Sequence, residues 1–214
     1  MKGALGPGKS PLDPYPSRLL EMEVELSKYL PNQREAINRV AKAIRKQVAL
    51  CSENPHPLGR FLAVGPNNVA TRLATGLAQF LFGDEKFVLE LDMADYSERH
   101  QVLGLIGHGG GLVCSYFVGT LTEPIWRRPQ TVIILSGIEK VHDAAWPILT
   151  EAMGEGVLIE GMGRSVSFTN TVFILTTMVG FAEGALSANL AQSAIECVVP
   201  AEMLHLICDI LPLR

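Results

Sequence analysis

The sequence is poor in charge and in long apolar runs, and each shortage argues against a class of protein. Charged residues make up 19% of the 214 residues, and the net charge is −4. The composition therefore gives no reason to expect nucleic acid or an anionic membrane as a partner. No apolar run approaches the roughly 20 residues that a membrane-spanning helix needs. No cationic start precedes an apolar signal segment either.

Cysteine and histidine are also scarce. The four cysteines and five histidines are scattered along the chain, without the spacing of a zinc site or of a disulfide framework. We therefore predict no metal site, and we interpret the cysteines as reduced packing residues of a cytoplasmic protein. The cysteines are Cys51, Cys114, Cys197 and Cys208.

The sequence does contain enough apolar material for a core, since hydrophobic residues make up 48% of it. Residues 1–16 are rich in glycine and proline, and we predict a disordered tail there and one domain over residues 17–214. Strands that alternate with helices predict an α/β fold, with a parallel sheet covered on both faces. We expect helices at 17–28, 33–50, 69–82, 96–106, 119–128 and 142–153, strands at 61–64, 87–91, 132–135 and 172–176, and a hairpin at 156–166.

The turn after the first predicted strand has the setting of a phosphate-binding loop without its residues. A P-loop reads Gly-x-x-x-x-Gly-Lys-Ser/Thr: backbone N–H groups cradle phosphates, the lysine neutralises them and the hydroxyl holds Mg²⁺. The segment here is Gly65-Pro66-Asn67-Asn68-Val69-Ala70-Thr71-Arg72. Ala70 stands in place of the second glycine, Thr71 in place of the lysine and Arg72 in place of the hydroxyl.

Some capacity to bind an anion is still expected at this turn. Asn67 and Asn68 tolerate left-handed conformations, so we expect the loop to keep its shape. Backbone N–H groups at the start of the next helix would still favour an anion. Arg72 has two interpretations: a partial substitute for the lysine, or a side chain that points to solvent, which we favour.

The literal P-loop pattern occurs once, from Gly3 to Ser10. A functional P-loop needs a strand before it and a helix after it. Only two residues precede this one, and Pro11 and Pro14 follow it closely. We interpret it as a coincidence within the tail.

From about Leu19 to Leu213, short segments follow one another in a familiar order and spacing. They are residues 20–33, Phe80-Leu-Phe-Gly-Asp84, Leu91-Asp-Met-Ala-Asp-Tyr-Ser97, Leu121-Thr-Glu123, Arg127-Arg-Pro129, Ile138-Glu-Lys-Val-His142, Gly161-Met-Gly-Arg164 and Phe168-Thr-Asn-Thr171. Together they resemble the AAA+ ATPase core of the Clp family of ClpA/ClpB-type chaperones, specifically the second ATPase module. The resemblance implies a three-layer P-loop NTPase large subdomain, with a parallel sheet flanked by helices. It also implies an adenine-contacting turn at Leu30 and Pro31.

The departures from the family pattern fall on the residues that the resemblance would make functional. The family's Walker B strand ends in Asp-Glu, which serve Mg²⁺ and the attacking water, whereas this strand ends in Ser136-Gly137. Met178 replaces a sensor asparagine. Leu206 replaces the arginine finger in an alignment with one inserted residue. Leu112 stands where the family's pore loop has a tyrosine. Since the sequence ends at Arg214, where the family's small helical lid subdomain would begin, we expect the lid to be absent.

These departures lead to several hypotheses about function. The first is a pseudo-ATPase with a structural or regulatory role in a chaperone-type assembly, partnered by an active AAA+/Clp subunit or by itself in a ring. We expect no meaningful ATP hydrolysis by this chain alone, because loss of a general base costs about 10²–10⁴ in rate and loss of an arginine finger about 10³–10⁵.

The other hypotheses keep part of the nucleotide chemistry or none of it. One is a sensor that holds ATP or ADP without cleaving it, at Leu30, Pro31 and the loop from Gly65 to Arg72, where Mg²⁺ lacks its usual ligands. Another is an ATPase chaperone subunit that works only with an intact partner. A gene copy without a selected role is the last.

Overall fold

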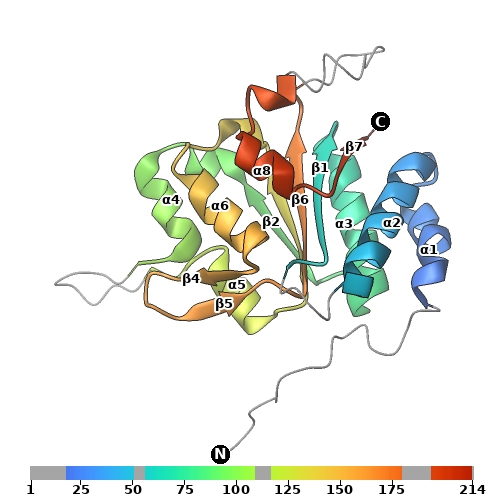
Figure 1. Cartoon of the computed structure of the whole chain (residues 1–214), viewed down its shortest axis with the longest axis horizontal. Helices are drawn as coiled ribbons and strands as arrows, with labels where there is room; N and C mark the ends of the chain where they lie inside the picture. Colours follow the sequence, from blue (N-terminus) through green and yellow to red (C-terminus); the bar gives the residue numbers. More distant parts are fainter. Residues whose placement is uncertain (1–17, 51–55, 109–116, 180–193, 214) are drawn as a thin grey trace, which may run out of the picture.

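Strands and helices alternate along the chain in the computed structural model, which describes residues 18–50, 56–108, 117–179 and 194–213 (Figure 1). The α-helices are α1 (Met22–Tyr29), α2 (Arg34–Leu50), α3 (Asn67–Phe82), α4 (Arg99–Ile106), α5 (Thr122–Arg127), α6 (Ala145–Gly154) and α8 (Ala201–Leu206). Short 3-10 helices are η1 (Arg18–Glu21), η2 (Met93–Tyr96) and η3 (Ile138–Lys140). The strands are β1 (Gly59–Val64), β2 (Val88–Asp92), β3 (Thr131–Ser136), β4 (Val157–Ile159), β5 (Ser165–Ser167), β6 (Thr171–Thr177) and β7 (Asp209–Pro212).

The main sheet has five parallel strands in the order β2-β3-β6-β1-β7. Every residue of β3 and of β6 is buried. Burial on both faces explains why the central strands read as continuous runs of Val, Ile, Leu and Phe. The predicted parallel sheet is confirmed.

Alternate residues of each strand enter different apolar layers, because successive side chains point to opposite faces of a sheet. Phe61 and Ala63 of β1 pack in one core with residues of α1, α2 and α3. Leu62 and Val64 pack in a second core with residues of α4, α6 and α8. The result is the three-layer arrangement of helices, sheet and helices that the family resemblance implied (Figure 1).

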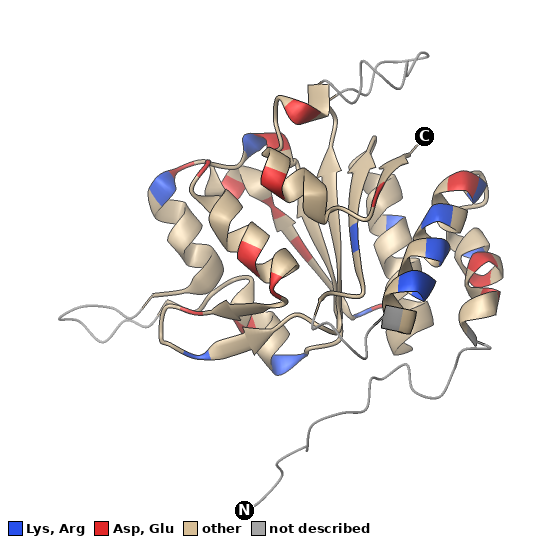
Figure 2. Cartoon of the chain, in the orientation of Figure 1, with Lys and Arg blue, Asp and Glu red and all other residues tan. Residues whose placement is uncertain are grey.

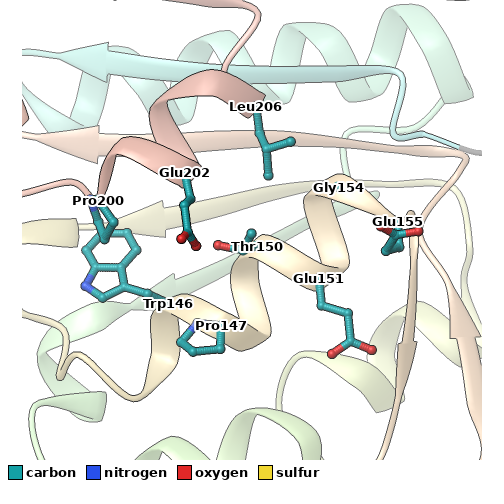
Figure 3. Close-up of a pocket in the computed structure, with 9 residues that line it drawn as sticks. All are labelled: Trp146, Pro147, Thr150, Glu151, Gly154, Glu155, Pro200, Glu202 and Leu206. Carbon is teal, nitrogen blue, oxygen red and sulfur yellow. The ribbon is translucent and has the colours of Figure 1, made fainter.

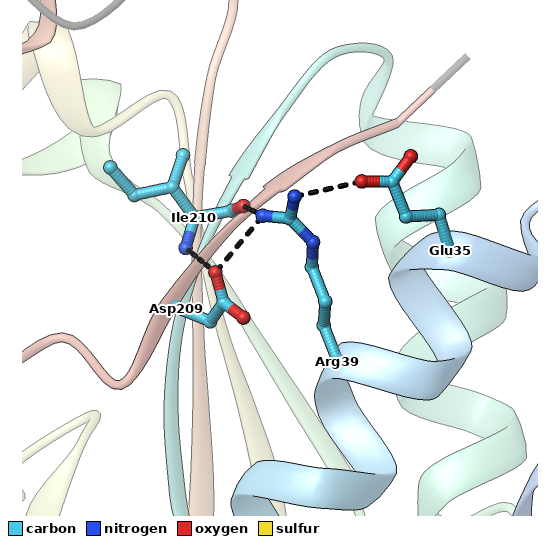
Figure 4. A network of polar contacts seen from close by, with 4 residues as sticks. All are labelled: Glu35, Arg39, Asp209 and Ile210. Carbon is cyan, nitrogen blue, oxygen red and sulfur yellow. Dashed lines mark hydrogen bonds and ion pairs between the residues drawn. The ribbon is translucent and has the colours of Figure 1, made fainter.

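The edge strand β7 was not predicted from the sequence. It pairs with β1 in parallel and ends at Pro212, a residue that edge strands tolerate because one side of the backbone needs no partner. Arg39 of α2 ties this strand to the helical layer (Figure 4). Its Nη1 donates to Asp209 Oδ1 at 3.2 Å and to the Ile210 carbonyl at 3.3 Å, while its Nη2 donates to Glu35 at 2.7 Å.

Two predicted helices differ in extent from those in the structure. The helix expected at 96–106 is interrupted, since η2 ends at Tyr96 and a capping box between Glu98 and Gln101 starts α4 at Arg99. The helix expected at 119–128 is confined to α5, and Pro124 lies in its first turn, where its missing N–H costs nothing. The predicted hairpin is confirmed as the antiparallel pair β4–β5. The predicted tail lies outside the described residues, so the division into tail and domain stays a prediction.

Candidate functional site

The ends of three neighbouring strands bring the predicted site residues to one edge of the sheet. β6 lies between β1 and β3, and all three run in the same direction. Gly65 follows β1, Ser136 ends β3, and Thr176 and Thr177 end β6. This carboxyl-terminal edge is where open α/β sheets bind ligands.

The residues after Gly65 form a helix and not a loop. α3 begins at Asn67, and only Pro66, which is extended with φ −61° and ψ 132°, precedes it. The prediction that Asn67 and Asn68 would keep a loop open in left-handed conformations is wrong. With no glycine between 66 and 75 to favour a positive φ, the helical conformation extends back to Pro66, whose φ is fixed just outside the helix.

This extension removes the phosphate cradle. In a P-loop the backbone N–H groups between the two glycines converge on the phosphates. Here the residues from Asn67 onward belong to the first turns of α3. Ala70, at the second glycine position, is 1% exposed. Thr71, at the lysine position, uses its hydroxyl to bond the Asn67 carbonyl at 3.0 Å.

A short chain of hydrogen bonds connects the three segments of this edge. The Thr176 hydroxyl donates to Asn67 Oδ1 at 2.7 Å and accepts from the Gly137 N–H at 3.2 Å. Thr176 is fully buried, and its bond from the Gly137 N–H is sheltered from water, whereas its partner Asn67 is exposed. The side chain of Asn67, one of the predicted nucleotide contacts, is therefore hydrogen-bonded within the protein.

The place of the two Walker B carboxylates is occupied by a buried serine and a left-handed glycine. The Ser136 hydroxyl donates to Glu90 of β2 at 3.2 Å. Gly137 has φ 68° and ψ 52°, a conformation in which a glutamate would be strained. A β-carbon built there would lie 3.5–3.7 Å from the Lys140 side chain.

Glu90 and Lys140 are charged residues near this edge that the sequence analysis missed. Neither has a hydrogen bond or ion pair to residues 65–72 within the described part of the chain. Glu90 could have been suspected only from its place in the strand beside β3, two residues before the register partner of Ser136.

The backbone conformation at position 65 and the close approach of Leu213 require a glycine there. Its φ is +142°, and a β-carbon there would lie 2.3 Å from the Leu213 carbonyl oxygen. The Gly65 N–H donates to the Thr177 carbonyl at 3.0 Å, and the Leu213 N–H donates to Val64 at 2.9 Å. The first glycine of the apparent P-loop thus has a structural role between β6 and the end of β7.

The remaining predicted nucleotide contacts differ in their exposure. Leu30 is 2% exposed and packs in the core at the end of α1, and Pro31 is exposed. Arg72 is exposed and has no hydrogen bond or ion pair with any described residue.

The other positions singled out by the resemblance have separate surroundings. Met178, at the sensor position, is 48% exposed. Leu206, at the arginine-finger position, lines a surface groove between α6 and α8. Leu112, the pore-loop equivalent, lies outside the described residues.

Two segments that carry the family resemblance, those with Glu123 and Arg164, are joined by ion pairs. Arg164 donates to Glu123 at 2.6 Å and to Glu160 at 2.8 Å, and its guanidinium lies 4.0 Å from the centre of the Trp126 ring. Arg127 donates to the other oxygen of Glu123 at 2.6 Å. These bonds, first from Arg164 and then from Arg127, hold the pKa of Glu123 below its ordinary value. The signatures around Glu123 and Arg164 therefore join α5 to the β4–β5 hairpin.

The residues at the carboxyl-terminal edge of β1, β3 and β6 do not suit Mg-ATP. The edge has no lysine in place, no pair of carboxylates and no open cradle of N–H groups. Over the described ranges, no group of three His, Cys, Asp or Glu residues could hold a metal ion. In the same ranges, no helix is both long enough and apolar enough to cross a membrane.

Comparison with known proteins places the chain among AAA proteins. The model of the AAA domain family (Cdc48 subfamily) matches residues 56–201. A chaperone protein ClpB from Mycobacterium bovis is 38% identical over 196 residues, which is 91% of this chain and 23% of that protein. A chaperone protein ClpB from Corynebacterium diphtheriae is 42% identical over 164 residues, which is 76% of this chain and 19% of that protein.

A solved structure supports the same assignment. A closed-state cryo-EM reconstruction of Hsp104 with ATPyS and FITC casein superposes with a TM-score of 0.80 at 27% identity. The match covers 91% of this chain and 35% of that one. Of the two ClpB relatives, the chain spans about a fifth to a quarter of the length.

Proposed function

Because the chain belongs to the AAA domain family (Cdc48 subfamily), we propose that it is a Clp-type pseudo-ATPase with a structural or regulatory role in a chaperone-type assembly. The observation that carries this proposal is the hydrogen-bonded chain Asn67–Thr176–Gly137. It occupies the edge of the sheet where a working member of the family would hold nucleotide.

Several missing groups weigh against hydrolysis. A missing lysine removes a charged hydrogen bond of roughly 1.5–3 kcal/mol to the phosphates. A missing general base costs about 10²–10⁴ in rate. These losses do not simply multiply, because such groups act as a unit. One of them alone leaves little turnover.

An ATPase assay on the purified chain with Mg²⁺ tests the proposal. We expect phosphate release no faster than in buffer. Turnover that disappears when Thr71 or Ser136 is changed to alanine would refute it, because the activity would then belong to this edge. Turnover that persists in both variants would indicate a contaminating enzyme, and repurification to constant specific activity separates that case.

A nucleotide sensor is the second candidate, and the exposed start of α3 favours it. This 16-residue helix has no side-chain cap, and Asn67 and Asn68 are exposed at its start. Its dipole would favour an anion there. Thermal unfolding with and without millimolar ATP or ADP tests this idea, since a ligand at 100 times its Kd adds about 2.7 kcal/mol of stability. An unchanged unfolding temperature would rule out the nucleotide sensor.

The proposed partners are protein subunits: an active Clp protein or further copies of this chain, in the cytoplasm. The resemblance to ClpB and Hsp104 modules supports them. If this chain turns over ATP only beside an intact partner, mixing the two proteins should change the partner's ATPase rate. Co-purification with an intact Clp protein is the accompanying measurement.

A further inference from the structure

The exposed face of α2 carries a row of cations that no carboxylate balances. Arg34, Lys42 and Lys46 are exposed, and none has an ion pair with a described residue. Asn38, also exposed, completes a set in which each member follows the last by four residues. We call these four residues the α2 row. Residues with this spacing are neighbours on a helix surface, so the row extends for about 18 Å along α2.

The two other cations of α2 are used within the molecule. Arg39 donates to Glu35 at 2.7 Å and to Asp209 at 3.2 Å, and so joins α2 to the edge strand β7. Arg45 donates to Glu23 at 2.6 Å, and so joins α2 to α1. The charges of the α2 row serve neither of these joints.

The stability of the helix does not account for the α2 row either. The backbone dipole favours cations in the last turn of a helix and disfavours them in the first. Arg34 is the first residue of α2, and no basic residue lies in its last turn. Lys42 and Lys46 are like charges four residues apart, a spacing at which they repel each other. A negative group from another molecule would relieve both costs.

The rest of the chain has the opposite charge. α2 contains five of the 18 basic residues and one of the 22 acidic residues, which leaves 13 basic and 21 acidic residues elsewhere. Figure 2 shows the cations of α2 and the acidic residues of α6 and α8 at separate places on the molecule. Glu151, Glu155 and Glu202 lie around the groove between those two helices (Figure 3). An acidic partner is therefore repelled by such surfaces and steered towards α2.

The surroundings of the α2 row also restrict the class of anion. α1 packs beside α2, and residues 21–25 at its start include Glu21, Glu23 and Glu25. A membrane surface or a nucleic-acid duplex, which is wide enough to cover both helices, would meet these carboxylates. α2 contains no aromatic residue on which an unpaired base could stack. A single narrow acidic segment of a protein avoids both difficulties.

We propose that the α2 row is a docking surface for an acidic segment of a partner protein, whose carboxylates meet Arg34, Lys42 and Lys46. An acidic helix with a carboxylate at every fourth position matches the row along its length. This inference goes beyond the pseudo-ATPase proposal and does not depend on it, because the row includes no residue of the carboxyl-terminal edge of β1, β3 and β6. The ATPase assay and the binding test below can therefore fail separately.

The test is fluorescence anisotropy of a labelled alanine-based peptide, with a glutamate at every fourth position, titrated with the full chain. We expect saturable binding that weakens as salt is raised, because salt screens exposed charges. The same peptide with glutamine in place of glutamate should not bind. Lys42→Gln/Lys46→Gln should lower the affinity about fivefold or more, since it removes two exposed ion pairs while keeping residues that favour a helix.

Matched variants separate this surface from charge effects in general. Lys86→Gln/Lys140→Gln makes the same change in net charge at exposed lysines on other elements, and it should bind the peptide as the parent does. Asn38→Lys fills the gap in the α2 row and should tighten binding about two- to threefold. Gln79→Lys adds the same charge at an exposed position of α3 and should leave binding unchanged. Thermal unfolding of each variant checks that it is folded.

Several results would overturn the proposal. One is a peptide that does not bind at low salt, and another is binding that Lys42→Gln/Lys46→Gln leaves unchanged. An oligonucleotide, or vesicles of phosphatidylcholine and phosphatidylserine, that bind the parent but not this variant would assign the row to another class of partner. Self-association of the parent that the variant loses would assign the row to a second copy.

Discussion

The Thr176 hydroxyl donates a hydrogen bond to the Asn67 side chain across 2.7 Å, which joins the end of β6 to the start of α3. The same hydroxyl accepts from the Gly137 N–H, so one buried threonine connects the three segments at this edge. The bond from the Gly137 N–H is buried, so it is costly to break, because the N–H left behind cannot reach water.

Replacement of Thr176 by valine tests this connection. Valine keeps the shape but leaves the Gly137 N–H without its acceptor, so we expect a loss of about 1–3 kcal/mol in the free energy of unfolding. Urea denaturation measures it. Thr75→Val is the control, since the Thr75 hydroxyl only bonds the Thr71 carbonyl within α3, and its loss should cost a few tenths of a kcal/mol. Equal effects of the two substitutions would contradict the account.

Replacement of Gly65 by alanine should be severely destabilising. The positive φ and the approach of the Leu213 carbonyl act together, and we expect a loss of about 2–4 kcal/mol. Gly83→Ala measures the cost of a positive φ alone, because Gly83 also has a positive φ but nothing lies within 4 Å of a β-carbon there. That control should cost about 1–2 kcal/mol. Chemical denaturation of both variants decides whether the close approach matters.

Restoring the family's residues should not restore ATP hydrolysis. The variant Ala70→Gly/Thr71→Lys/Ser136→Asp/Gly137→Glu supplies the second glycine, the lysine and the two carboxylates, but α3 already includes the former loop, and the network of Thr176 competes for the site. We also expect Gly137→Glu to cost about 1–2 kcal/mol, because φ there is 68°.

Two measurements check this expectation. Phosphate release by the restored variant should stay at the level of buffer, and turnover of the kind that the family shows would contradict the account. Gly137→Asn is the stability control, since asparagine tolerates left-handed conformations and should cost less than glutamate.

Acid should weaken the joint between α5 and the β4–β5 hairpin. Hydrogen bonds from Arg164 and Arg127 lower the pKa of Glu123 in the folded protein. The ionised Glu123 therefore stabilises the fold fully above the ordinary carboxyl pKa of 4.5. This stabilisation is lost as the pH falls from 4.5 through the lowered pKa of the folded protein. Glu123→Gln should therefore lose less stability than the parent between pH 7 and pH 3.

Thermal unfolding across this pH range measures the difference. Glu155→Gln is the control, since Glu155 is exposed and has no ion pair with a described residue, and it should follow the parent. The assignment fails if Glu123→Gln and the parent lose stability in parallel.

The sheet and its two helical layers could be predicted because burial on both faces leaves a strong pattern. Val132–Leu135 and Val172–Thr176 are nearly continuous apolar runs, and their neighbours alternate with amphipathic helices. The strand β7 could not be predicted in this way. It is short, contains Asp209 and Pro212, and gains its stability from pairing with β1 and from Arg39.

The shape of the turn after Gly65 was not predicted from the sequence. The order of the strands brings Gly65, Ser136 and the end of β6 to one edge of the sheet. Asn67 is also hydrogen-bonded to Thr176, which lies 109 residues further along the chain. No local pattern of sequence reports a contact of that kind.

The measurement that tests the central claim most directly is a calorimetric titration of the purified chain with Mg-ATP. We predict only the heat of dilution, because the former loop is helical and the side chain of Asn67 is bonded to Thr176. Saturable heat that is lost in Thr71→Glu, which would repel phosphate at the start of α3, would contradict the account.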